Sequence, residues 1–160
     1  MEPYTTTLAE KLGHLLLEKK LKLVTAESCT GGGIAYAITS IPGSSQYFEQ
    51  GFVTYSNSSK QKLLNIDNNI INIYGSVSEE TATSMAEGAI QNSDADISLS
   101  VTGIAGPDGG SAAKPVGTVW FGLAGKSFST KTLHKHFSGN RKEIRQISIQ
   151  AGLEFLLSIF

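Results

Sequence analysis

Apolar residues recur along the chain in two spacings, and these predict that helices alternate with strands. Helical spacing marks three long segments: one ends near Lys19–Lys20 after a capping-box pattern at Thr7, one is opened by Ser78, and one is opened by Asn140. Two shorter helices are expected near residues 30–39 and 60–64. Strand composition appears at residues 21–26, 51–56, 95–101, 117–124 and 130–137, the last two forming a hairpin at Gly125. The pattern of residues 65–73 is ambiguous, and their Asn-rich composition favours a loop or a frayed turn.

This alternation predicts an α/β fold. We expect one domain, residues 1–160, built as a three-layer α/β/α sandwich around a mixed, mostly parallel sheet. Ligands of such sheets bind beyond the carboxyl ends of the strands. Three predicted strand ends are polar, at residues 27–30, 55–57 and 102–103. The sequence therefore predicts that these three segments form a site.

Composition narrows the possible partners. Hydrophobic residues make up 40% of the chain and charged residues only 17%, against a typical ~25%, which fits either a large buried sheet or a subunit interface. The last turn, residues 155–160, is apolar nearly all round and predicts a buried end or a subunit contact, so we expect a homo-oligomer, a dimer or larger. The net charge is −1 with no Lys/Arg block, which argues against nucleic acid as a partner.

The sequence predicts a cytoplasmic location. The N-terminus lacks the basic and apolar regions of a secretory signal, and no apolar run approaches the ~20 residues that cross a bilayer, so no membrane partner is expected. The single cysteine, Cys29, excludes an intrachain disulfide and a cysteine-based zinc cluster.

The most informative stretch is the turn from the first strand into a glycine cluster, where Ser28 and Cys29 lie. A helix N-terminus at this point would offer unpaired N–H groups to an oxyanion. Ser28 is either a helix N-cap or a nucleophile, although the G-x-S-x-G elbow is absent. Cys29 is either a second candidate nucleophile, with its thiol pKa lowered by the helix, or a small buried apolar residue.

A serine nucleophile needs a base, and Lys60 is the best placed. It follows a strand end and lies near a helix start, where the dipole and burial disfavour its charged form, although a lone lysine is more commonly a solvated surface charge. The histidines lie in the first helix and on a late strand. A literal S-x-x-K at residues 111–114 is followed by Pro115, which disfavours helix at Lys114, so this match is discarded.

Other residues at the expected site have two interpretations each. Tyr55 is either a hydrogen-bond donor or a packing residue, and Arg141 is either a ligand for a carboxylate or phosphate or an exposed charge. The glycine loop at 103–110 allows a ligand to approach the backbone closely. It matches neither the P-loop nor the dinucleotide fingerprint, so ATP and NAD have no direct support.

Nearly the whole chain resembles the C-terminal domain of the CinA family of competence/damage-inducible proteins, whose active members are nicotinamide mononucleotide (NMN) amidohydrolases. The segments that carry the resemblance are Thr25–Gly32, Ile41–Ser45, Tyr55–Asn57 with Lys60, Val77–Glu80, Val101–Pro107, Lys114–Val119 and Gly139–Arg141.

The resemblance implies hydrolysis of the carboxamide of NMN, a small-molecule nucleotide, to nicotinate mononucleotide and ammonia without a metal or other cofactor. It implies Ser28 as the nucleophile, Lys60 as the general base and Tyr55 as an assisting group. The residues that it implies for nucleotide binding are Thr30, Gly31, Gly32, Asn57, Thr102, Gly103 and Arg141.

Two departures from the family pattern bear on these expectations. Asn140 stands where the family often has an acidic residue, which changes the charge beside Arg141. The chain also lacks the large N-terminal domain of many relatives, so we expect the stand-alone form. The competing hypothesis is a catalytically silent ligand-binding or interaction module, which would be expected to lose the serine or the lysine.

Overall fold

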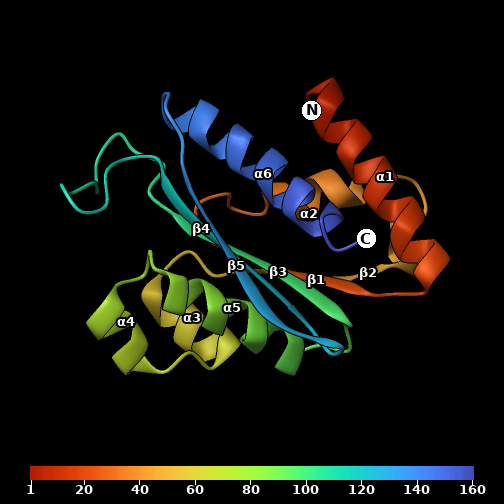
Figure 1. Cartoon of the computed structure of the whole chain (residues 1–160), viewed down its shortest axis with the longest axis horizontal. Helices are drawn as coiled ribbons and strands as arrows, with labels where there is room; N and C mark the ends of the chain where they lie inside the picture. Colours follow the sequence, from red (N-terminus) through yellow and green to blue (C-terminus); the bar gives the residue numbers. More distant parts are fainter.

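The computed structural model describes all 160 residues and has a five-stranded sheet between two layers of helices (Figure 1). The elements in chain order are α1 (Pro3–Lys19), β1 (Leu23–Glu27), α2 (Gly33–Thr39), a 3-10 turn (Ser44–Gln46), β2 (Phe48–Val53), α3 (Asn57–Leu64), α4 (Asn68–Tyr74), α5 (Glu79–Gln91), β3 (Ile97–Gly103), β4 (Thr118–Gly125), β5 (Phe128–His136) and α6 (Arg141–Leu157).

The strand order is β2-β1-β3-β4-β5. β1 pairs in parallel with β2 and with β3, while β4 pairs antiparallel with both β3 and β5. Only β4 therefore runs against the other four strands, which confirms the expected mixed, mostly parallel sheet. The predicted hairpin between β4 and β5 is also confirmed.

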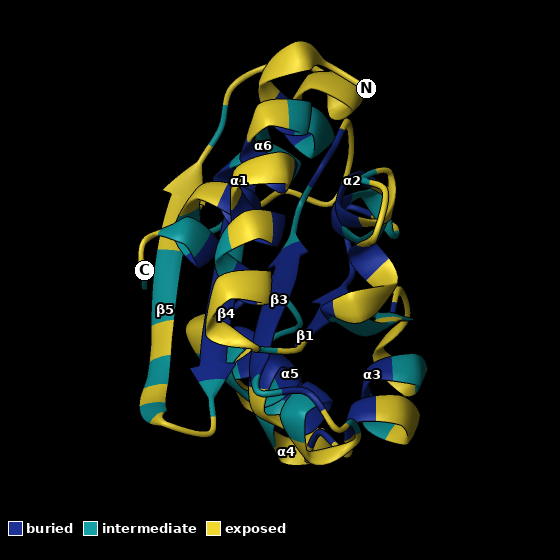
Figure 2. Cartoon of the chain, turned by 90° about the vertical axis from the view of Figure 1, so that its right-hand side faces the viewer, coloured by how far each residue is buried: buried dark blue, intermediate teal, exposed yellow.

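Helices α1, α2 and α6 cover one face of the sheet, and α3, α4 and α5 cover the other (Figure 1). β1 is buried along its whole length and β3 along all but its last residue, whereas β5 at one edge is largely exposed (Figure 2). A Cβ on Gly122 of β4 would lie 2.4 Å from the carbonyl oxygen of Ala82 in α5. This glycine therefore allows α5 to lie close against the sheet.

Two expected element assignments were wrong. The predicted loop at 65–73 contains helix α4, because the Asp67 carboxylate accepts a hydrogen bond from the Asn69 N–H (2.8 Å) and Ile71 is buried against the core. Helix α1 begins at Pro3 rather than at Thr7, since proline fits the first turn of a helix. The Thr7 hydroxyl bonds back to the Pro3 carbonyl oxygen (3.2 Å), inside the helix.

Several strand and helix ends also differ by a few residues from the predicted ones. β2 starts at Phe48, before the predicted residue 51, and β1 extends to Glu27. The predicted N-caps Ser78 and Asn140 are confirmed, since both side chains accept hydrogen bonds from the first turns of α5 and α6. The apolar end at residues 155–160 packs partly buried against the chain's own core, which supports the buried-end alternative.

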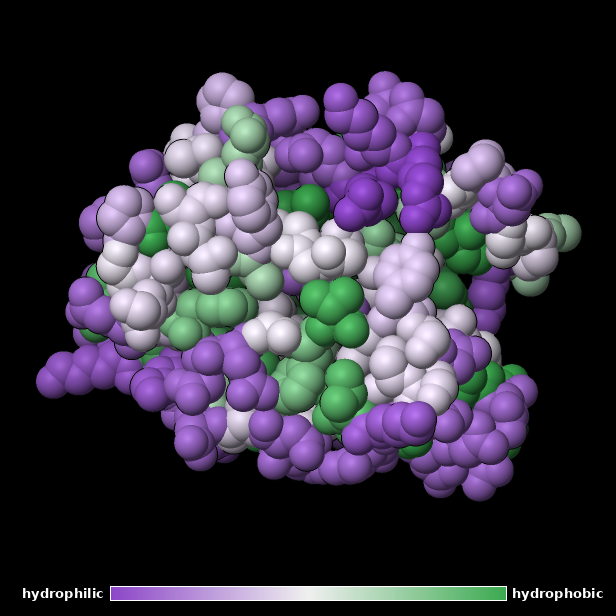
Figure 3. Space-filling model, turned by 180° about the vertical axis from the view of Figure 1, so that it is seen from behind, coloured by the Kyte–Doolittle hydropathy of each residue, from purple (hydrophilic) through white to green (hydrophobic).

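The view from behind Figure 1 shows apolar and weakly polar side chains in the middle of one face, ringed by hydrophilic ones (Figure 3). Several large apolar side chains are exposed, as is common on protein surfaces. No helix is both long and apolar enough to span a membrane.

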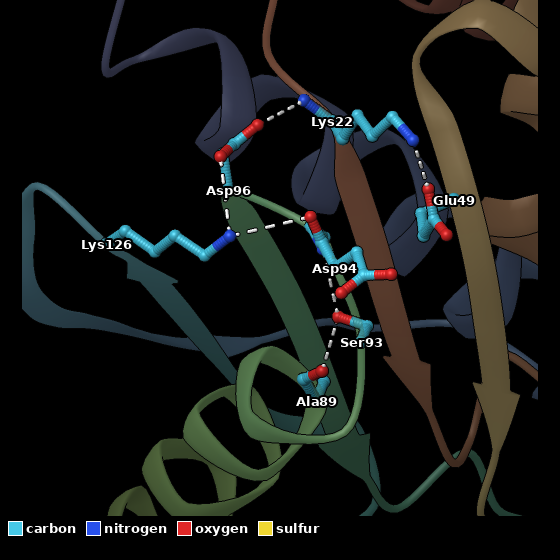
Figure 4. Close-up of polar contacts among 8 residues, drawn as sticks. Lys22, Glu49, Ala89, Ser93, Asp94, Asp96 and Lys126 are labelled. Carbon is cyan, nitrogen blue, oxygen red and sulfur yellow. Dashed lines mark hydrogen bonds and ion pairs between the residues drawn. The ribbon is translucent and has the colours of Figure 1, made fainter.

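Polar contacts tie the strands together at the amino-terminal ends of β1 and β3 (Figure 4). Asp96 accepts from the Lys22 N–H (2.9 Å) and lies 3.6 Å from the Lys126 amine, while the Lys22 amine pairs with Glu49 at 2.9 Å. These ionic groups are partly exposed and contribute little stability each. Their effect is to link neighbouring strands at this end of the sheet.

Candidate active site

A cavity of about 270 Å³ lies at the carboxyl-terminal ends of β1 and β3. Its walls come from the turn after β1, the segment after β2 with α3, the loop after β3, and the start of α6. The lining residues are Ser28, Cys29, Tyr55, Asn57, Lys60, Ser76, Val77, Thr102, Gly103, Ile104, Ala105, Gly106, Asp108, Gly109 and Arg141. The three polar strand ends singled out in the sequence thus meet in one cavity.

Ser28 and Lys60 are in direct contact in this cavity. The Lys60 Nζ lies 3.0 Å from Ser28 Oγ, 2.9 Å from the Thr54 carbonyl oxygen and 3.5 Å from the Tyr55 carbonyl oxygen. Lys60 is only 1% exposed, and no carboxylate pairs with it. A buried amine without a counter-ion is one whose charged form is disfavoured.

Burial lowers the pKa of Lys60 to about 8. A neutral amine has two N–H bonds and one lone pair. If the two N–H bonds point to the carbonyl oxygens of Thr54 and Tyr55, the lone pair is left for the hydroxyl of Ser28. The arrangement is therefore suited to accepting the serine proton.

The local sequence at the start of α3 positions Lys60 in the cavity. Ser56 is the N-cap, its hydroxyl accepting from the Ser59 N–H (3.1 Å), and the Ser59 hydroxyl accepts in turn from the Ser56 N–H (3.1 Å). Lys60 is the fourth residue of the helix and is buried, with its amine at the Thr54 carbonyl oxygen directly after β2. The capping box thus fixes the helix start that aims the lysine at the turn after β1.

The turn that carries Ser28 differs from the one expected. α2 begins at Gly33, five residues after the serine, rather than near Thr30. Its first N–H groups are already occupied, because the buried Glu27 carboxylate accepts from Ile34 N (3.0 Å), Ala35 N (2.8 Å) and the Thr30 hydroxyl (2.6 Å). The expectation that the start of this helix supplies oxyanion donors was therefore wrong.

The two N–H groups that directly follow Ser28 are free. The amides of Cys29 and Thr30 make no hydrogen bond to another residue, whereas the Ser28 N–H donates to Val101 O (3.0 Å) and Gly31 N–H to Ser28 O (3.0 Å). On the opposite side of the turn, Arg145 of α6 donates to the carbonyl oxygens of Cys29 (3.1 Å) and Thr30 (2.9 Å). The nucleophile turn is thus held from two sides and keeps two free donors directly after the serine.

The Cys29 thiol has the opposite pKa shift from the one expected. The residue is 5% exposed, and burial raises the pKa of its thiol to about 12. The expected lowering by a helix N-terminus was wrong, since α2 starts four residues further on and Glu27 occupies its first donors. The buried apolar interpretation of Cys29 fits this environment better than the nucleophilic one.

Tyr55 and Arg141 form the rim of the cavity. One guanidinium nitrogen of Arg141 donates to the Tyr55 hydroxyl oxygen (2.7 Å), and the other donates to the Gly106 carbonyl oxygen (2.8 Å). The phenol accepts from the arginine and keeps its own O–H free to donate. Arg141 thereby joins the start of α6 to the glycine loop and to the segment after β2.

The remaining predicted binding residues fall into two groups. Asn57, Thr102 and Gly103 line the cavity, with the Thr102 hydroxyl donating to Ser76 O (2.6 Å). Thr30, Gly31 and Gly32 do not line it: Thr30 is fully buried, and the two glycines have positive φ angles of 59° and 90°. These two glycines provide the backbone conformation of the turn, which L-residues adopt rarely.

Four polar or charged residues in or behind the cavity had no predicted role. Asp108 and Ser76 line it, while Glu27 and Arg145 hold the turn behind it. The position of Arg145 near the cavity could have been predicted, because it follows Arg141 by four residues and so lies on the same helix face. Glu27 carried a weaker signal, as an acidic residue at the end of an otherwise apolar strand.

A second cavity of about 450 Å³ lies at the opposite, amino-terminal end of β3. It is lined by apolar residues and by lysines that are exposed at the surface, and it holds no nucleophile in contact with a base. No group of three or more His, Cys, Asp or Glu side chains is arranged to hold a metal ion anywhere in the chain. The Ser28 cavity is accordingly the candidate active site.

The fold and this cavity define a member of a known class: the chain belongs to the CinA C-terminal domain family, whose model matches residues 5–160. A relative from Pseudomonas putida is 46% identical over 99% of this chain and 98% of its own length, and one from Enterobacter agglomerans is 51% identical over 86% and 84%. Both are named nicotinamide-nucleotide amidohydrolase PncC.

A solved structure, that of the competence/damage-inducible protein CihA from Agrobacterium tumefaciens, has a TM-score of 0.97 with 38% identity over 99% of this chain and 96% of that one. Other relatives are much longer. The CinA-like protein of Endomicrobium trichonymphae is 52% identical over 94% of this chain, which spans only 35% of that protein's length.

Proposed function

We propose that this protein hydrolyses the carboxamide of NMN, giving nicotinate mononucleotide and ammonia. The observation that carries the proposal is the 3.0 Å contact between Ser28 Oγ and the amine of Lys60, buried at the edge of a cavity. The names of the two PncC relatives, which match most of the chain, support the choice of a nicotinamide nucleotide as the substrate.

In the proposed reaction, neutral Lys60 takes the hydroxyl proton of Ser28 while the Ser28 oxygen forms a bond to the carboxamide carbon. The carbonyl π electrons move to oxygen, and the N–H groups of Cys29 and Thr30 donate to that oxyanion. When the intermediate collapses, the C–N bond breaks and the amine nitrogen takes the proton from Lys60 to leave as ammonia. Water then cleaves the acyl-serine ester with Lys60 again acting as base. No metal or redox cofactor enters this scheme.

The other residues of the cavity are proposed to bind or assist. Tyr55 has a free O–H at the rim and is suited to donating to the carboxamide or to the leaving nitrogen. Asn57, Thr102 and Gly103 are proposed to contact the nucleotide from the cavity wall. For Thr30, Gly31 and Gly32 we propose a contribution through the backbone, with Thr30 supplying an N–H and the glycines the turn.

Ammonia release from NMN by the purified protein tests this function. The expected result is one ammonia per nicotinate mononucleotide formed, with a covalent mass increase on Ser28 when the acyl intermediate is trapped. No release at saturating NMN would instead support the competing hypothesis of a silent ligand-binding module. That hypothesis has less support, because both Ser28 and Lys60 are present and in contact.

Arg141 is proposed to bind the phosphate of NMN. Replacing it with Gln is expected to raise KM for NMN by about tenfold or more, the usual cost of losing one charge-assisted hydrogen bond. Nicotinamide riboside, which lacks the phosphate, should be turned over with the same KM by the variant and the wild type. Lys142→Gln, an equal change of charge at the next, exposed residue, is the matched control. An equal loss for both substrates would assign Arg141 to the rim structure instead.

We also propose that the chain forms a homo-oligomer, a dimer or larger. The support is the unpaired edge of β2 beside two exposed apolar side chains, Tyr36 (65% exposed) and Val53 (50% exposed). Light scattering should give a mass of at least two chains for the wild type and of one chain for Val53→Lys. Leu17→Lys, on the exposed face of α1, should keep the wild-type mass. A monomeric wild type would contradict the proposal.

A further inference from the structure

The contacts of Arg145 suggest a task in the reaction although its side chain does not line the cavity. Its guanidinium donates to two successive carbonyl oxygens, those of Cys29 (3.1 Å) and Thr30 (2.9 Å). Those residues directly follow the candidate nucleophile. No carboxylate pairs with Arg145, so its charge acts on the turn alone.

Peptide planarity links these contacts to the free donors. In a trans peptide, the C=O of one residue points opposite to the N–H of the next. Arg145 holds the Cys29 carbonyl, so the Thr30 N–H, which belongs to the same peptide plane, must point away from the arginine. That N–H makes no hydrogen bond within the chain although Thr30 is fully buried. A buried, unpaired donor with an imposed direction is unusual and calls for an acceptor.

Glu27 restrains the same turn from the other side. Its buried carboxylate accepts from the Thr30 hydroxyl and from the first amides of α2, so these cannot rotate toward the nucleophile. The Gly31 N–H is bonded to the Ser28 carbonyl oxygen. Within this turn, the N–H groups of Cys29 and Thr30 directly follow the nucleophile and make no hydrogen bond to another residue, so both are left for a ligand.

We propose that Arg145 is a positioning residue for amide hydrolysis, acting through the Cys29–Thr30 peptide to aim and polarise the Thr30 N–H, one of the two N–H groups that stabilise the oxyanion. The inference rests on the proposed function. A cation on the carbonyl oxygen withdraws electron density from the peptide and makes its N–H a stronger donor. Because the Arg145 side chain does not itself line the cavity, it should act on the transition state and not on ground-state binding.

The test compares Arg145→Gln, Arg145→Lys and wild type in NMN hydrolysis. Arg145→Gln is expected to lower kcat by about 10²-fold, the cost of one lost oxyanion donor, with KM unchanged. Arg145→Lys keeps the charge but can reach one carbonyl more easily than two, so an intermediate kcat is expected. The apparent pKa on the acidic side of the pH profile of kcat/KM should stay at the wild-type value in both variants, because neither changes Lys60. Lys142→Gln, the same charge change on the exposed side of α6, should leave kcat and KM unaltered.

A second readout separates oxyanion stabilisation from general loss of structure. The aldehyde analogue of NMN would form a hemiacetal with Ser28 and place its oxygen at the proposed donors, whereas nicotinate mononucleotide binds without that bond. Arg145→Gln should weaken binding of the aldehyde by about the same factor as it lowers kcat and leave product binding unchanged. Equal weakening of both ligands, or a kcat within threefold of wild type, would overturn the inference.

The two possible failures are distinguishable. If wild-type protein releases no ammonia from NMN, the proposed function fails, whatever Arg145 does. If the wild type is active and Arg145→Gln raises KM with kcat unchanged, Arg145 is a binding residue and the positioning role is wrong. Should Arg145→Gln fail to fold, as judged by circular dichroism, the aldehyde and kcat measurements on Arg145→Lys decide the question.

Discussion

Ser28→Ala is expected to lower kcat/KM for NMN by roughly 10⁴- to 10⁶-fold, the range found when a serine nucleophile is removed from an enzyme of this kind. The reason is that no other nucleophile in the cavity contacts Lys60, which lies 3.0 Å from Ser28 Oγ. Ammonia release over a range of NMN concentrations gives the measurement. The acyl intermediate should also disappear from trapped samples.

Cys29→Ser is the matched control for the loss of Ser28. Burial raises the pKa of the Cys29 thiol to about 12, so a thiolate nucleophile is not available near neutral pH. The variant exchanges sulfur for oxygen next to the nucleophile, and its kcat/KM should stay within about tenfold of wild type. If Cys29→Ser is inactive while Ser28→Ala turns over at close to the wild-type rate, the assignment of the nucleophile is reversed.

Lys60→Met is expected to lower kcat/KM by about 10²- to 10⁴-fold, the usual contribution of a general base. Methionine is similar in length and suits the buried position of Lys60, but it cannot accept the serine proton. Since the neutral amine is the base and burial lowers its pKa to about 8, wild-type kcat/KM should rise about tenfold per pH unit below pH 8 and level off above it. The residual activity of Lys60→Met should lack this limb.

Lys62→Met is the control for the lysine. It removes an equal charge from the same helix, two residues later, where the side chain is exposed. Its rate and pH profile should match those of the wild type. A Lys60→Met variant that keeps the acidic limb near pH 8 would show that another group is the base, and the Ser–Lys mechanism would then be wrong.

The helix and strand pattern was recoverable from sequence because most elements carry their own signal. The N-caps at Ser78 and Asn140 and the hairpin at Gly125 depend on neighbouring residues only, and all three are confirmed. Helix α4 was missed for the opposite reason. Its Asn-rich sequence has little helix propensity, and it forms because Asp67 caps it and Ile71 packs into the core.

The site was partly recoverable for a similar reason. In a largely parallel sheet the carboxyl ends of strands share an edge, so the polar ends of β1, β3 and the segment after β2 were expected to meet. The contact of Arg145 with the turn escaped prediction because it joins α6 to the turn after β1, across more than a hundred residues of sequence. No local pattern encodes such a contact.

The sequence by itself determined the α/β class, the turn at Ser28 and the membership of Lys60 in a helix that starts just after a strand, since each follows from residue order and spacing. Only the tertiary structure decided that the Lys60 amine is buried beside Ser28 and that burial raises the pKa of the Cys29 thiol. It also decided that the amides of Cys29 and Thr30 make no hydrogen bond to another residue. Those properties depend on desolvation and on which groups consume which hydrogen bonds. Both are set by packing among elements far apart in the chain.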